Sequence, residues 1–132
     1  MQSDITFEAM PKSYKVMIVE DDESDLFLLT RMLRKIYPDV QVMAASCVQD
    51  AYSVYMKSPL DLILLDLNLP DGYGPSTVRE VRRFNRVVPI VVVTGLGTHL
   101  TILEALKNGA NDVLLKAKIT DGDFSDTLRQ IL

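Results

Sequence analysis

The chain of 132 residues has the usual length of one compact domain and can bury a core without disulfide bonds or a structural metal. Its composition, 48% hydrophobic and 24% charged with a formal net charge of −4, is that of a globular protein and excludes a disordered or fibrous chain. Scattered basic residues indicate no direct binding of nucleic acid, short apolar runs predict no membrane segment, and the single Cys47 without a signal-peptide pattern favours the cytoplasm.

The first part of the chain predicts a leader, a strand and a helix. Residues 1–12 show no clear period, so we expect a flexible leader ahead of a single domain at 13–132. The apolar run at 15–20 stops at acidic residues, which is typical of a buried strand. Apolar residues then recur every three or four positions over 26–36, with basic residues between them. This spacing predicts an amphipathic helix that ends before Pro38.

The alternation of strand and helix continues along the chain. We expect further strands at 40–45, 60–65, 89–94 and 112–115, a loop at 68–74, and further helices at 48–59, 76–85, 101–108 and from Asp121 or Asp123 onward. Strands that are apolar on both sides have no polar face for water, so they predict a parallel sheet covered by helices on both faces. The predicted fold class is therefore α/β, with a doubly wound sheet of five parallel strands.

Polar and charged residues stand at the ends of four of these strands. Asp21 and Asp22 follow the first strand, Asp66 follows the third, Thr94 ends the fourth and Lys116 follows the fifth. In open parallel sheets the functional crevice lies beyond the carboxyl ends of the strands. We therefore expect these side chains to converge at one edge of the sheet.

The aspartates of this group predict a site for a divalent cation. Asp21, Asp22 and Asp66 would repel one another at the mouth of the sheet without a cation, and carboxylate oxygens in a partly hydrated site suit magnesium. The competing interpretation is that acidic residues at the start of a helix only stabilise its dipole, by about 0.3 to 1 kcal/mol each. For Glu23 and Asp25 we prefer that second interpretation.

Asp66 has a further chemical role open to it. A lone carboxylate after so apolar a strand is costly to bury unless it is paired, and Lys116 is the candidate partner. When a metal and a lysine neutralise the oxygens of a transferring phosphoryl group, an aspartate can attack phosphorus and form an acyl phosphate. Thr94 could then donate its hydroxyl to one of those oxygens. The sequence thus predicts an aspartate that accepts a phosphoryl group.

From Lys15 to Leu132 the sequence resembles the receiver domains of bacterial two-component systems. The residues that carry this likeness are the acidic pair Asp21 and Asp22, the phosphoacceptor Asp66 within the segment 64–72, Thr94 and Lys116. The resemblance implies a flavodoxin-like sheet with strand order 2-1-3-4-5. It also implies magnesium bound by the side chains of Asp22 and Asp66, by the backbone carbonyl of Asn68, and by Asp21 directly or through water.

The resemblance further implies a signalling role for the chain. It would be a phosphoacceptor that assists its own phosphorylation and dephosphorylation, and not an enzyme with a separate substrate. The expected partner is a histidine kinase or a histidine phosphotransfer domain, which donates the phosphoryl group from phosphohistidine. A homodimer or a covalently linked output domain is a further expectation, whereas neither nucleic acid nor a membrane is.

Two residues depart from the family pattern and keep an alternative open. Val113 stands where many receivers carry an aromatic residue, and Ala117 stands where they carry proline, which predicts a different or weaker conformational switch. The alternative is a receiver-like interaction module that acts without phosphate. Enzymes of the same architecture are disfavoured, because a phosphohydrolase would need a second carboxylate at Asn68 and a flavin protein would need a phosphate-binding loop where this chain has acidic residues.

Overall fold

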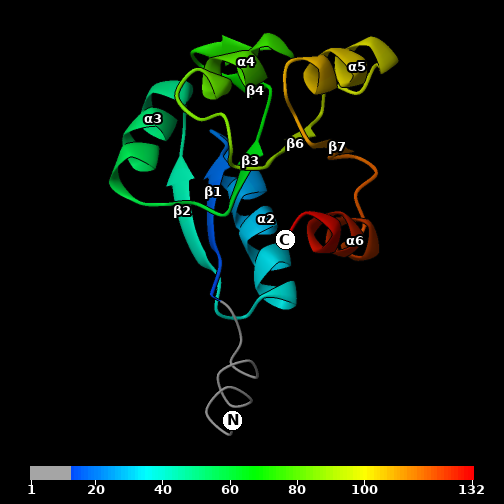
Figure 1. The fold of residues 1–132 in the computed structure, drawn as a ribbon. Helices are drawn as coiled ribbons and strands as arrows, with labels where there is room; N and C mark the ends of the chain where they lie inside the picture. The colour runs from blue at the N-terminus through cyan, green and yellow to red at the C-terminus, as the bar shows by residue number, and fades with distance from the viewer. Residues whose placement is uncertain (1–12) are drawn as a thin grey trace, which may run out of the picture.

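A computed structural model of the protein describes residues 13–132, and the predicted leader at 1–12 lies outside the described residues. Strands and helices alternate along the chain (Figure 1): β1 (Lys15–Val19), α2 (Glu23–Ile36), β2 (Gln41–Ala45), α3 (Val48–Lys57), β3 (Leu62–Leu65), β4 (Asn68–Leu69), β5 (Gly72–Tyr73), α4 (Ser76–Arg82), β6 (Ile90–Thr94), α5 (His99–Lys107), β7 (Asp112–Leu115) and α6 (Asp121–Ile131). Of the helices in this part of the chain, none has the length and apolar character needed to cross a membrane.

Five of the strands form one parallel sheet in the order β2-β1-β3-β6-β7, which confirms the predicted fold class and strand order. The chain passes from β1 to the edge strand β2 and then crosses back to β3, on the other side of β1 (Figure 1). The order of strands therefore changes direction between β1 and β3. At such a switch point the carboxyl ends of two neighbouring strands open a crevice.

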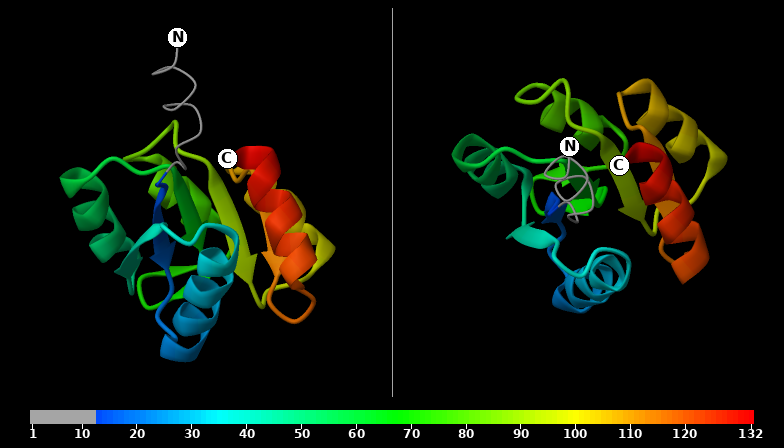
Figure 2. Two further views of the ribbon diagram at one scale, coloured as in Figure 1. Left: turned by 90° about the horizontal axis from the view of Figure 1, so that it is seen from below. Right: turned by 60° about the horizontal axis from the view of Figure 1, so that its bottom comes forward.

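Side chains of the central strands alternate between two hydrophobic clusters, one on each face of the sheet. Met17 and Val19 of β1 belong to the cluster covered by α3, α4 and α5, whereas Val16 and Ile18 belong to the cluster covered by α2 and α6. Figure 2 shows the two helical layers with the sheet between them. Because both faces are covered, the strands are apolar at successive positions, as the sequence indicated.

The predicted loop at 68–74 contains a small antiparallel hairpin, formed by β4 and β5. The sequence did not indicate it, because two residues per strand are too few to show an alternating pattern and the turn formers Pro70 and Asp71 dominate the segment. Gly74 follows with a φ of 83°, a conformation that suits glycine. Its N–H donates to the carbonyl of Leu67 at 2.7 Å, so the hairpin closes the loop that follows β3.

Several helices differ from the prediction at their ends, among them α4 and α5. Helix α4 stops at Arg82, before its predicted end, and in the segment that follows the side-chain oxygen of Asn85 accepts hydrogen bonds from the N–H groups of Val87 and Val88 at 3.1 and 3.0 Å. These bonds turn the chain toward β6. Helix α5 begins earlier than predicted because the hydroxyl of Thr98 caps its first turn.

Asp71, in the turn of the hairpin, caps helix α3 from another part of the chain. Its carboxylate accepts hydrogen bonds from the N–H groups of Val48 and Gln49, at 2.8 and 3.0 Å. The N-cap residue of the helix, Cys47, offers a weaker sulfur acceptor, 3.4 Å from the nitrogen of Asp50. Burial raises the pKa of Asp71, but the backbone hydrogen bonds outweigh this effect and hold the pKa below its ordinary value of 3.8.

Replacing Asp71 with alanine is expected to lower the free energy of unfolding by about 1 to 2 kcal/mol, because both N–H groups lose their acceptor. Urea denaturation followed by circular dichroism measures this loss at pH 7. Asp39→Ala, at an exposed aspartate in another loop, is the control and should change stability by less than about 0.5 kcal/mol.

Because the folded-state pKa of Asp71 is lowered, the contribution of its charge to stability is present above pH 3.8 and disappears as the pH falls through the folded-state pKa. Equal losses in the two variants at pH 7 would contradict the cap.

Candidate functional site

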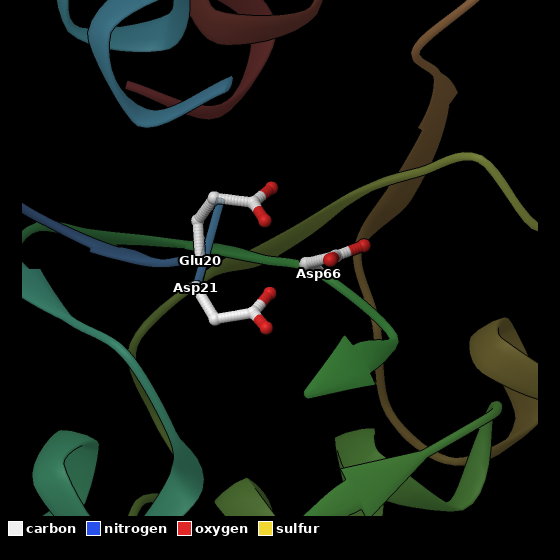
Figure 3. Close-up of side chains that lie close together, drawn as sticks. All are labelled: Glu20, Asp21 and Asp66. Carbon is white, nitrogen blue, oxygen red and sulfur yellow. The ribbon is translucent and has the colours of Figure 1, made fainter. Parts of the chain in front are cut away.

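The carboxyl ends of β1 and β3 bring three acidic side chains together. In the ladder between these strands Val19 pairs with Leu65, so the residues that follow, Glu20 and Asp66, emerge side by side. The N–H of Asp66 donates to the carbonyl of Val19 at 3.0 Å, which fixes this register to the end of the strand. One carboxylate oxygen from each of Glu20, Asp21 and Asp66 lies within 4.8 Å of the other two (Figure 3). The edge of the sheet thus concentrates three negative charges.

Two of these three carboxylates are buried and one is exposed. Glu20 is 3% exposed and Asp66 is 5% exposed, whereas Asp21 faces solvent. Each buried carboxylate has a backbone donor. The nitrogen of Leu67 lies 2.9 Å from Oδ1 of Asp66, and the nitrogen of Asp22 lies 3.2 Å from Oε2 of Glu20. Two buried charges of the same sign at this separation are unfavourable unless a cation compensates them.

Lys116 supplies a positive charge to this group. Its Nζ lies 2.7 Å from Oε1 of Glu20, 2.8 Å from Oδ2 of Asp25 and 3.6 Å from Oδ2 of Asp66. Its backbone N–H donates to the carbonyl of Thr94 at 2.9 Å, which holds the end of β7 against β6. Burial lowers the pKa of Lys116, but hydrogen bonds to Asp25 and Glu20 outweigh this effect and raise the pKa above its ordinary value. Lys116 is therefore a cation at neutral pH.

The pKa of Glu20 is raised above its ordinary value. Burial is the largest cause and the charge of Asp66 adds to it, while the hydrogen bonds from Lys116 and Asp22 act in the opposite direction. One lysine thus faces several carboxylates and does not fully offset the cost of their burial. Such a set of oxygens suits an additional divalent cation, whose charge would stabilise the ionised form of Glu20.

Thr94 and Asn68 complete the set of site residues predicted from the sequence. Thr94 is buried at the end of β6, the neighbour of β3, and its Oγ1 accepts a hydrogen bond from the N–H of Leu96 at 3.1 Å. Its hydroxyl hydrogen remains available for donation. Asn68 is exposed at the start of the hairpin, two residues after Asp66. The metal-binding role predicted for its carbonyl stays a prediction.

The structure brings Glu20 and Asp21 next to Asp66, and the metal-binding role predicted for Asp22 stays a prediction. Strand β1 ends at Val19, so Glu20 and Asp21 are the first two residues beyond it. Asp22 is already the N-cap of α2, where its Oδ1 accepts a hydrogen bond from the N–H of Asp25 at 2.9 Å. The available signal for Glu20 was its position directly after the apolar run, but the acidic residues that follow it obscured this signal.

The remaining site residues are arranged close to expectation, with one addition. Asp66 and Lys116 come together at the same edge of the sheet, as predicted from the strand ends. Asp25 lies in the first turn of α2, as its interpretation as a helix-dipole residue requires, and its carboxylate also pairs with Lys116 across 91 positions of sequence. No local pattern reveals such a contact, because it depends on how α2 packs beside the end of β7.

Comparison with known proteins gives a consistent family match. The family model described as "Response regulator receiver domain" matches residues 16–126. The Transcriptional regulatory protein KdpE of Staphylococcus aureus is 37% identical over 102 residues, which are 77% of this chain and 43% of the relative. The Transcription factor SKN7 of Saccharomyces cerevisiae is 32% identical over 120 residues, which are 91% of this chain and 19% of the relative. The chain therefore spans less than half the length of these relatives.

Solved structures share the fold. A two-component response regulator from Clostridium difficile superposes with a TM-score of 0.80 at 24% identity and covers 90% of this chain and 95% of the other. The receiver domain of the sensor histidine kinase PA1611 from Pseudomonas aeruginosa superposes with a TM-score of 0.77 at 25% identity, with 91% and 98% covered. The latter structure is described as having a magnesium ion coordinated in the active site cleft.

Proposed function

This chain belongs to the response regulator receiver domain family of two-component signal transduction, and from this premise we propose that Asp66 accepts a phosphoryl group in a magnesium-dependent reaction. The proposed donor is a phosphohistidine of a histidine kinase or a histidine phosphotransfer domain. The observation that carries the proposal is the environment of Asp66. Its carboxylate is buried, with Oδ1 held by the N–H of Leu67 and Oδ2 near Lys116.

The acidic group fits the proposed magnesium ion. Magnesium binds carboxylate oxygens, keeps several waters and uses substrate phosphate as a further ligand. Glu20 and Asp66 offer buried oxygens, and the exposed Asp21 leaves the site open to water. The carbonyl of Asn68 is a further proposed ligand. When bound, the ion would neutralise the oxygens of the transferring phosphoryl group.

The side chains of the site have distinct proposed roles in the transfer. An oxygen of Asp66 forms a bond to phosphorus while the bond from phosphorus to the donor histidine nitrogen breaks, and that electron pair stays on the nitrogen. Lys116 brings its charge to the phosphoryl oxygens, and the buried hydroxyl of Thr94 donates a hydrogen bond to one of them. The chain is modified in this reaction, so we propose a phosphoacceptor and not an enzyme acting on a separate substrate.

The output of the signal is proposed to lie with a partner. The relatives named above are called a transcriptional regulatory protein and a transcription factor, and this chain matches only part of each. This supports transmission of the phosphorylated state to a covalently linked output domain, or to a second copy of the domain. Direct contact of this domain with nucleic acid is not part of the proposal.

Incubation with acetyl phosphate and magnesium is expected to add a single phosphoryl group, measured by intact mass. Chelation of magnesium with EDTA should slow this addition by at least about a hundredfold, because the negative oxygens of Asp66 and the donor then repel one another. Restoring excess magnesium in the same sample is the control and should recover the rate. Equal incorporation with and without EDTA would contradict the metal dependence. No incorporation under any of these conditions would favour a module that acts without phosphate.

A further inference from the structure

One carboxylate at the site, that of Asp25, lies outside the acidic group formed by Glu20, Asp21 and Asp66. It belongs to the first turn of α2, and its Oδ2 lies 2.8 Å from Nζ of Lys116. This contact is shorter than the 3.6 Å between Lys116 and Asp66. The carboxylate of Glu20 lies at nearly the same distance, with its Oε1 2.7 Å from Nζ of Lys116. Lys116 is therefore shared almost equally between Glu20 and Asp25.

The start of α2 leaves the carboxylate of Asp25 free to make this contact. In a capping box, the side chain of Glu or Gln at the third helical position reaches back to the N–H of the N-cap residue. Here that N–H, on Asp22, donates to Oε2 of Glu20 at 3.2 Å. In turn, Oδ1 of Asp22 accepts the N–H of Asp25 at 2.9 Å and fixes the backbone of Asp25. The N-cap thus fixes the backbone of Asp25, while the carboxylate of Asp25 contacts Lys116.

The surroundings of the pair favour a defined ion pair over a loose surface contact. The side chains of Asp25 and Lys116 are 38% and 24% exposed. They border a cavity of about 60 Å³ whose apolar lining consists of Leu28, Leu29, Met32, Val93 and Ile119. Apolar walls and partial burial reduce the screening of the two charges by water.

We propose that Asp25 is a positioning residue that holds Lys116 in place and allows Glu20 to serve a divalent cation. This inference rests on the proposed function, because it concerns the same magnesium site. An oxygen of Glu20 that is engaged by the ammonium of Lys116 is less available to a cation. Asp25 gives Lys116 an equally close partner outside the acidic group, so Lys116 remains paired when Glu20 turns to the cation. Without Asp25, Lys116 is left to Glu20 and Asp66 and competes with the cation for both.

Calorimetric titration with magnesium tests this role by affinity, without any phosphoryl transfer. Asp25→Asn is expected to raise the Kd for magnesium about tenfold, since it removes the partner that keeps Lys116 paired when Glu20 turns to the cation. The control is Glu23→Gln, which removes one negative charge from an exposed position in the same helical turn and should raise the Kd less than about threefold. Asp25→Glu keeps the charge and can still reach Lys116, so it should stay within about threefold of the wild type.

A double-mutant cycle with Lys116→Met separates positioning from simple loss of charge. If Asp25 acts through Lys116, Asp25→Asn in the Lys116→Met background should have no larger effect than Glu23→Gln. A full tenfold effect in that background would overturn the inference, as would equal effects of Asp25→Asn and Glu23→Gln or a failure of Asp25→Glu to preserve affinity. Absence of magnesium binding by the wild-type chain would overturn the proposed function itself. Wild-type binding with an unaffected Asp25→Asn variant would overturn the positioning role alone.

Discussion

Asp66→Asn is expected to abolish stable phosphoryl incorporation from acetyl phosphate in the presence of magnesium. Asparagine has nearly the shape of aspartate, and its amide oxygen can still accept the N–H of Leu67, but it lacks the charged oxygen that attacks phosphorus. Intact mass measurement should show no phosphorylated species at times when the wild type is largely converted. Because one of two close buried negative charges is removed, we expect the thermal midpoint of the variant to equal or exceed that of the wild type.

The control for Asp66→Asn is Asp61→Asn, which changes an aspartate just before the other end of β3. Asp61 accepts a hydrogen bond from the N–H of Lys15 at 2.9 Å, and an asparagine oxygen can replace that acceptor. The control should be phosphorylated at a rate within about twofold of the wild type, since it lies at the opposite edge of the sheet. A phosphorylated Asp66→Asn variant would place the acceptor on another residue and contradict the proposed function.

Lys116→Ala is expected to affect both reaction and stability, because Lys116 pairs with a buried carboxylate. We expect phosphorylation to slow by about a hundredfold, since a preorganised charge next to the transferring group is lost. We also expect the free energy of unfolding to fall by about 2 kcal/mol. This is less than the roughly 3 to 5 kcal/mol typical of a fully buried pair, because the lysine side chain is 24% exposed. Urea denaturation in the presence of a chelator measures the second effect.

The stability loss of Lys116→Ala should depend on pH in a defined direction. The pKa of Glu20 is already raised by burial, and Lys116 is among the groups that lower it, so the substitution raises it further. A carboxyl group whose pKa is raised by folding binds a proton more readily in the folded state than in the unfolded state. The stability of the variant therefore recovers as the pH falls toward 4.5, the ordinary pKa of this group. Lys118→Ala, at an exposed lysine of the same loop, should change stability by less than about 0.5 kcal/mol. An equal loss at pH 7 and pH 5 would contradict the role of Glu20.

Most of the fold could be predicted because each buried strand is a short apolar run with a polar residue directly after it. The run of residues 62–65 ends in Asp66 and that of residues 90–93 ends in Thr94, so the functional edge of the sheet is visible in the sequence. The β4–β5 hairpin carries no such signal, because its strands have two residues each. Helix ends set by single side chains, such as the N-cap Thr98 of α5, also escape pattern analysis.

The details of the site depend on register and packing, which a single sequence does not reveal. Four acidic residues follow Val19, and only the pairing of Val19 with Leu65 determines that Glu20 lies beside Asp66. The contact between Asp25 and Lys116 requires α2 to pack beside the end of β7. Sequence reasoning therefore found the sheet edge and the phosphoacceptor candidate, but it did not indicate that Glu20 lies beside Asp66 or that Asp25 contacts Lys116.

The pairing of β1 with β3 also limits how this domain can evolve. Loops at the opposite end of the sheet can gain or lose residues with little effect on the acidic group, because none of its carboxylates lies there. Insertion or deletion of one residue inside β1 would turn Met17 and its neighbours to the opposite hydrophobic cluster and move Glu20 away from Asp66 at the same time. Both the packing of the core and the position of Glu20 beside Asp66 therefore constrain the length of β1. We expect related domains to vary in the loops at the opposite end of the sheet while β1 keeps its length.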